Sequence, residues 1–155
     1  MPNTTSPAKP VSDEIHRAIQ ALQRLSDLFA ERRAQLAREA GVTEAQWRML
    51  EQVDDADFLP SLFARQRACT PAAVSRTLRQ LLDADLVRVS IGADDGRQRI
   101  YQLTARGRRV LGRLRQGRAA AIARIWQPLG QSALAQFARF AERLADRLEA
   151  YADSA

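Results

Sequence analysis

The sequence predicts a mainly α-helical chain with one small β-hairpin. Apolar residues recur at spacings of three and four over most of the chain, and helix-capping residues precede these stretches. One short segment instead shows the alternation that is typical of strands. At 155 residues the chain is long enough for one core and too short for two ordinary domains, so we expect a single folding unit.

The first predicted helix follows a polar, proline-rich segment, residues 1–11, which we expect to be a disordered tail. Ser12 precedes two acidic residues and is the expected N-cap. The helix continues to about Arg38, and Gly41 ends it. Its apolar stripe consists of Ile15, Ile19, Leu22, Leu25, Phe29 and Leu36.

Two short helices are predicted next. Thr43 caps a helix over residues 44–53. Asp57 caps another, which has Pro60 in its first turn and ends near Arg67. The expected buried residues of the two helices are Trp47, Met49, Leu50 and Val53, and then Leu59, Leu62 and Phe63.

Thr70 and Pro71 mark the start of a fourth helix, since a capping hydroxyl is followed by the residue favoured at the first helical position. The helix should run to about Ala84. The residues expected on its buried face are Val74, Leu78, Leu81 and Leu82. The opposite face carries Ala72, Ser75, Arg76 and Arg79.

The hairpin and two further helices complete the predicted order of helix, helix, helix, helix, strand, strand, helix, helix. Residues 86–91 and 97–103 alternate and flank a glycine- and aspartate-rich turn. Thr104 caps a long helix, which Pro128 and Gly130 interrupt. The last helix is expected to start at Ser132, with an apolar stripe of Leu134, Phe137, Phe140, Leu144, Leu148 and Tyr151.

Basic charge is concentrated in the middle of the chain. The whole sequence has 24 Lys and Arg against 18 Asp and Glu, a net charge of +6. The segment from Arg65 to Arg118 alone holds 13 arginines, four aspartates and no lysine. This distribution favours an anionic partner such as nucleic acid, while a solvated arginine-rich surface is the alternative that composition leaves open.

Other classes of protein find little support in the sequence. One cysteine and one histidine can form neither an internal disulfide nor a structural zinc site, so no metal or cofactor is expected. No nucleophile has a recognisable base, and no glycine-rich phosphate loop is present, so we do not expect an enzyme. Without an export signal or a membrane-spanning segment, the expected location is the cytoplasm.

The third and fourth helices, joined by a turn of about three residues, form a helix-turn-helix, and the hairpin after them makes it winged. The second helix of such a pair enters the major groove of double-stranded DNA with its N-terminal residues nearest the bases. The expected contacts are Thr70, Ala72, Ala73, Ser75, Arg76 and Arg79, of which Arg76 or Arg79 can pair with guanine.

Two wing arginines are further candidates. Arg97 and Arg99 share a strand face, and Arg97 adjoins the turn, where its side chain can reach the minor groove. Asp95 can hold the stem of Arg97 in place. Ordinary surface charge is the alternative for both arginines.

At this point the chain resembles the MarR family of bacterial transcription regulators, over roughly residues 12–151. The matching motifs are Thr70-Pro-Ala-Ala-Val-Ser-Arg-Thr-Leu, Leu86-Val, Asp95-Gly-Arg97 and Leu103-Thr-Ala-Arg-Gly107. The resemblance implies major-groove contact by residues 72–79 and minor-groove contact by Arg97, braced by Asp95.

Family members usually have glycine where this chain has Asp85, and aspartate tolerates the left-handed conformation required there. The short helix before the recognition helix, Leu59-Pro-Ser-Leu-Phe-Ala-Arg, also departs from the family pattern, so this is a divergent member.

The resemblance also implies a homodimer that dimerises through its terminal helices, residues 12–38 and 105–151, around a DNA-binding winged helix over about 43–104. Those helices carry more apolar side chains than one small domain can cover; packing on each other within a monomer is the alternative. Such a dimer would read a pseudo-palindromic operator and act as a repressor released by a small aromatic or phenolic effector. The alternative function is a helical homodimer that binds proteins without specific affinity for DNA.

Three further residues have competing interpretations. Cys69, beside Arg67, is either a redox-sensing thiol or a small residue filling the turn. Trp47 resembles the family's tryptophan near the effector cleft, and a plain core tryptophan explains it equally well. His16 either touches an effector or lies on the surface or at the dimer contact.

Overall fold

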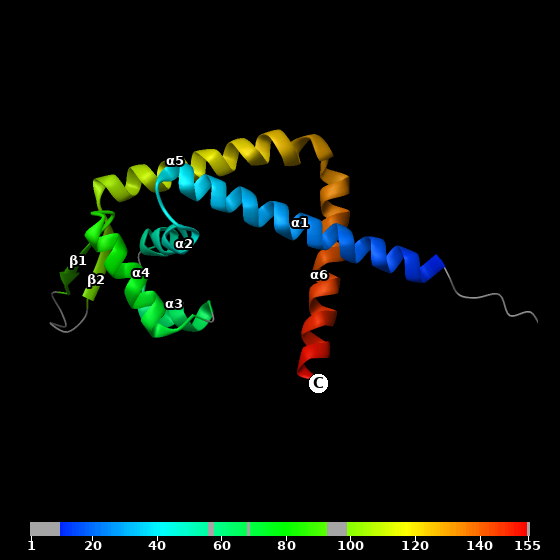
Figure 1. The fold of residues 1–155 in the computed structure, drawn as a ribbon, viewed down its shortest axis with the longest axis horizontal. Coiled ribbons are helices and arrows are strands. Elements are labelled where there is room, and N and C mark those ends of the chain that lie inside the picture. The colour runs from blue at the N-terminus through cyan, green and yellow to red at the C-terminus, as the bar shows by residue number, and fades with distance from the viewer. Residues whose placement is uncertain (1–9, 56–57, 68, 93–98, 155) are drawn as a thin grey trace, which may run out of the picture. The chain divides into compact units, whose positions relative to one another are not determined.

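The computed structural model describes residues 10–55, 58–67, 69–92 and 99–154, and side chains from residue 13 onwards (Figure 1). Six α-helices and a two-stranded antiparallel hairpin follow one another in the predicted order. The predicted fold class, a mainly α-helical chain with a small hairpin wing, is therefore confirmed.

Helix α1 spans Pro10–Ala40, 31 residues. It begins two residues before the predicted cap at Ser12, so residues 10 and 11 belong to the helix and not to a tail. Pro10 explains the earlier start, because proline is favoured in the first helical turn, where its missing N–H removes no hydrogen bond. Residues 1–9 lie outside the described residues. At its C-terminal end α1 reaches the core, where Leu36, Ala37 and Ala40 are buried.

Helix α2, Glu44–Val53, has the predicted bounds, and its buried residues are the predicted Trp47, Met49, Leu50 and Val53. Helix α3 spans Pro60–Gln66. The predicted cap, Asp57, lies outside the described residues, and the N-cap position is Leu59, which makes no side-chain cap. The prediction of the buried residues of this helix was wrong in part. The helix buries Phe63, as predicted, and Ala64, whereas Leu59 and Leu62 are exposed.

Helix α4 spans Pro71–Asp83 and buries Val74, Leu78 and Leu81, with Leu82 half-buried. It packs against α2, α3 and strand β1. Strand β1, Val87–Ile91, pairs with β2, Arg99–Leu103, from Val87 opposite Leu103 to Ile91 opposite Arg99. Figure 1 shows α2, α3 and α4 gathered beside this hairpin.

Helix α5 spans Ala105–Ala121. A π-helical turn, Ile122–Trp126, and a 3₁₀ turn, Gln127–Leu129, follow it, and α6 spans Gln131–Asp153. The predicted interruption at Pro128 and Gly130 is confirmed. Helix α6 starts one residue before the predicted Ser132 because Gly130, at φ 80°, occupies its N-cap position.

The chain divides into two compact units, Met1–Leu114 and Arg115–Ala155. The buried hydrophobic residues all lie in the first unit, between Leu36 and Leu114. None of the described residues from 115 to 154 is buried. Within the described residues, no helix is long and apolar enough to cross a membrane.

Candidate nucleic-acid interface

The start of α4 is fixed by a short network at the α3–α4 junction. The backbone N–H of Cys69 donates to the carbonyl of Ala64 at 3.0 Å, which closes the end of α3. The hydroxyl oxygen of Thr70 accepts from the N–H of Ala73 at 3.2 Å, so Thr70 is the N-cap as predicted. Pro71 follows in the first turn, where it leaves no N–H without a partner.

The face of α4 opposite the core is open. Ala72, Ala73, Ser75, Arg76 and Arg79 are all exposed, as the helical period predicts once Val74, Leu78 and Leu81 are buried. No ion pair or side-chain hydrogen bond joins Arg76 or Arg79 to another described residue. Two small residues at the helix start and two uncommitted guanidinium groups one to two turns later therefore share this face.

Contacts near the C-terminal end of α4 set its orientation. Near the start of α2, the side chain of Gln46 donates to that of Gln80 on α4 at 3.4 Å. After α4, Asp85 adopts φ 54°, so the predicted left-handed residue is confirmed. The hydroxyl of Thr104 donates to the carbonyl of Asp85 at 2.7 Å, and its N–H donates to the carbonyl of Leu86 at 3.1 Å. The end of α4 and the start of α5 are thereby joined at the base of the hairpin.

The hairpin offers one described candidate arginine. Arg99 is exposed, pairs with Ile91 across the strands, and has no described ionic partner. Arg88 on β1 is engaged instead, since it donates to the side chain of Gln102 at 3.0 Å. Arg97 and Asp95 lie outside the described residues, so minor-groove entry by Arg97 and its bracing by Asp95 stay predictions.

Solved structures share this architecture. A crystal structure of a MarR family transcription regulator matches with a TM-score of 0.81, covering 93% of this chain and 96% of that one at 20% identity. MarR family protein Rv2887 of Mycobacterium tuberculosis, in complex with salicylic acid, matches with a TM-score of 0.60 and 27% identity. This match covers 80% of this chain and 93% of that one. A mutant of MepR from S. aureus bound to an oligodeoxyribonucleotide matches with a TM-score of 0.61 and 16% identity, covering 84% of this chain and 97% of that one. The chain has the MarR fold. No family model and no curated protein matches the sequence.

Within the MarR fold, the two residues predicted for an effector cleft have different surroundings. Trp47 is buried in the core, with 6% of its surface exposed. Its indole Nε1–H is the one buried side-chain polar atom of the described residues that has no hydrogen-bond partner. His16 is exposed on the N-terminal half of α1. The structure therefore does not unite the two residues in one buried site.

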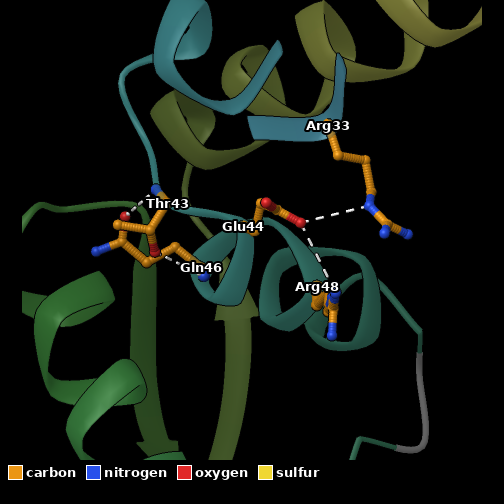
Figure 2. Close-up of polar contacts among 5 residues, drawn as sticks. All are labelled: Arg33, Thr43, Glu44, Gln46 and Arg48. Atoms are coloured by element: carbon orange, nitrogen blue, oxygen red, sulfur yellow. Dashed lines mark hydrogen bonds and ion pairs between the residues drawn. The ribbon is translucent and has the colours of Figure 1, made fainter. Parts of the chain in front are cut away.

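The contact between α1 and α2, close to Trp47 along the chain, contains polar interactions that the sequence analysis missed (Figure 2). The carboxylate of Glu44 lies 3.3 Å from Arg33 of α1 and 3.7 Å from Arg48. Thr43 and Gln46 form a reciprocal capping box. The signal for the capping box was present, because threonine followed three residues later by glutamine is its signature. The ion pair between α1 and α2 has no such local signal.

Cys69, the single cysteine, is exposed two residues before α4. Its thiol donates to the carbonyl of Arg67 at 3.3 Å. This contact ties the side chain to the turn, which is compatible with its interpretation as a small turn residue. A redox role for Cys69 stays a prediction. Among the described residues, no group of three or more histidine, cysteine or acidic side chains is placed to hold a metal ion.

Proposed function

We propose that this protein is a transcription regulator that binds double-stranded DNA sequence-specifically as a homodimer, acting in the cytoplasm. The observation that carries the proposal is the exposed face of α4, with small residues at its start and with Arg76 and Arg79, which no other described residue engages, behind them. A winged helix of the MarR fold presents this face.

Each residue of the face has a distinct role in the proposal. Ala72 and Ala73 permit close approach to the floor of the major groove, which is about 12 Å wide. The oxygen of Thr70 accepts from the backbone, so its O–H remains available to donate to a phosphate. Ser75 donates to a phosphate or base edge. Arg76 or Arg79 pairs with guanine O6 and N7, worth about 1 to 3 kcal/mol of base discrimination.

The wing supplies the second contact. Arg97, together with Arg99, which is exposed on β2, is proposed to contact the adjacent minor groove, where narrow A·T-rich segments attract arginine. Asp95 is proposed to brace Arg97. Because minor-groove contacts distinguish bases poorly, replacing a wing arginine should weaken binding with little change in base preference.

Selection from a pool of random duplex DNA tests the proposal. Duplexes retained at about 150 mM salt are sequenced, and affinity is then measured against salt concentration. An enriched inverted repeat, with log affinity falling steeply as log salt rises, is the expected result. Arg76→Ala and Arg79→Ala should lose enrichment, whereas Arg38→Ala, an exposed arginine at the end of α1, is the matched control. No enrichment and no salt-dependent binding would refute the proposal.

Dimerisation is proposed because the helices at both chain ends expose many large apolar side chains. Residues 13–31 are exposed throughout, and residues 115–154 contain no buried side chain. The exposed large apolar residues in these regions are Ile15, Ile19, Leu22, Leu25, Leu28, Phe29, Ile122, Ile125, Leu129, Phe137, Phe140, Leu148 and Tyr151. A monomeric soluble protein rarely exposes so much apolar surface, so a second copy is the proposed cover.

A small aromatic or phenolic effector is proposed to relieve repression by changing the spacing of the two recognition helices. The unpaired Nε1–H of Trp47 can donate to such a ligand, and Arg33 and Arg48, which pair with Glu44 in the structure, can exchange that carboxylate for one on the ligand. Rv2887, which shares the fold, was solved in complex with salicylic acid. His16, which does not share a buried site with Trp47, is retained as a separate proposed effector contact on α1.

Sodium salicylate is the probe for this site. The chain has two tryptophans, so Trp126→Phe leaves Trp47 as the sole indole emitter. Saturable quenching of its emission, together with weaker binding to the selected operator, is the expected result. If salicylate changes neither the emission nor the affinity for DNA, salicylate is excluded as an effector.

A further inference from the structure

An acidic residue occupies the end of the otherwise basic face of α4. Ala72, Arg76, Arg79 and Asp83 follow one another at spacings of four, three and four residues, which places them in one row along the helix. All four side chains are exposed. The row therefore runs from a small residue, through two positive charges, to a negative charge at the last helical residue.

The position of Asp83 does not favour the stability of α4. The C-terminal end of a helix carries partial negative charge, which an aspartate opposes, and no basic residue occupies the last turn of α4. No ion pair joins Asp83 to another described residue, although Arg79 is only one turn away. A local choice that opposes stability at the edge of a binding face points to a role in binding.

The length of α4 places Asp83 at the edge of the groove when DNA is bound. Thirteen residues at 1.5 Å each span about 20 Å, whereas the major groove is about 12 Å wide. If the N-terminal residues contact the bases, the C-terminal end emerges beside the phosphates that border the groove.

We propose that Asp83 is a specificity-determining residue, which weakens binding to DNA of any sequence by repelling a backbone phosphate. The inference rests on the proposed function. Binding without sequence preference depends almost wholly on phosphate contacts, so it is penalised most. In the specific complex, base contacts near Ala72 and Arg76 hold the N-terminal half of α4 in the groove and offset the repulsion. Asp83 thereby widens the difference between operator and random DNA, and it favours entry of α4 by its N-terminal end.

Three variants test the inference. Asp83→Asn removes the charge, and Asp83→Glu retains it. Asp85→Asn is the matched control, because it removes an exposed charge two residues away, outside the row, and asparagine also tolerates the left-handed backbone. Affinity for a random duplex and for the selected operator is measured between about 50 and 200 mM salt. Circular dichroism verifies that each variant keeps the helical fold.

The expected result is a gain in non-specific affinity for Asp83→Asn alone. One additional phosphate contact steepens the dependence of log affinity on log salt by about 0.9, which over this salt range corresponds to roughly a threefold change. The affinity for random duplex should rise by about that factor or more at low salt, and the ratio of operator to random affinity should fall. Asp83→Glu and Asp85→Asn should match the wild type.

Two outcomes overturn the inference while leaving the proposed function intact. In one, Asp83→Asn leaves the affinity ratio unchanged. In the other, it weakens operator binding and relaxes preference at a single base pair, which would make Asp83 a direct reader of cytosine. If the wild-type protein binds neither duplex, the proposed function itself fails.

Discussion

Gly107 of α5 lies against the backbone carbonyl of Leu86, the residue between α4 and β1, so closely that a Cβ at position 107 would overlap the carbonyl oxygen. The same carbonyl accepts from the N–H of Thr104, and the hydroxyl of Thr104 caps Gly107. Two backbone segments, the α4–β1 junction at Leu86 and the start of α5, therefore meet where position 107 has no room for a side chain. This joint connects the proposed recognition helix to α5.

Replacing Gly107 by alanine should strongly destabilise the protein. The added methyl group meets backbone, which cannot rotate away, so the joint must open; overpacking of this kind costs about 1 to 3 kcal/mol or more. Urea unfolding followed by circular dichroism measures the loss. Gly112→Ala in the same helix is the matched control, because a Cβ added there would meet nothing within 4 Å and alanine favours helix by up to about 1 kcal/mol. Equal stability of the two variants would contradict the close contact.

Asp85 should tolerate glycine and resist a β-branched residue. At φ 54°, a non-glycine residue costs roughly 1 to 2 kcal/mol, a cost that aspartate reduces and valine increases. Asp85→Gly is therefore expected to keep or slightly raise the midpoint of urea unfolding, and Asp85→Val to lower it. If both variants unfold at the same urea concentration, the left-handed backbone is not what constrains this position.

Local sequence signals predicted most of the fold. Thr43, Thr70 and Thr104 each cap the helix assigned to them, because a capping hydroxyl acts within three residues of its own position. The left-handed turn at Asp85 was predictable for the same reason. Where the local signal was weak, the prediction failed: Leu59 and Leu62 looked like a buried face, but a helix of seven residues has too little period to define one.

The residues of the candidate site could be predicted from the sequence, but the contacts between helices that support it could not. The exposed row of α4 follows from the period of its apolar residues, so Arg76 and Arg79 were identified from sequence alone. Arg33 and Glu44 form an ion pair between two helices, and Gln46 and Gln80 contact each other across 34 positions of sequence. Such pairs depend on how helices pack, which no local pattern encodes.

The capping box of α2 should contribute more to stability than the ion pairs of Glu44. Thr43→Ala leaves the backbone N–H of Gln46 without its partner and should cost about 1 kcal/mol. Glu44→Gln removes both ion pairs, but the side chains of Arg33 and Arg48 are about half exposed, so solvent screening keeps the cost below about 1 kcal/mol. Chemical unfolding of both variants at low and high salt distinguishes the contributions: only the Glu44→Gln difference should shrink in salt. A larger loss for Glu44→Gln would indicate that its ion pairs are better shielded than their exposure suggests.

The terminal helices should fold and pair together. The apolar stripe of α6 is exposed, and in the proposed homodimer a second copy covers it and removes it from water. Phe140→Asp combined with Leu148→Asp places two charges in that stripe and should shift sedimentation from twice the chain mass to the chain mass. Ala135→Asp combined with Ala150→Asp adds the same charges away from the stripe and should leave the dimer intact. For the wild type, the thermal midpoint should rise with protein concentration, as association linked to folding demands. A wild-type monomer with a concentration-independent midpoint would remove the basis for a paired recognition helix and for a palindromic operator.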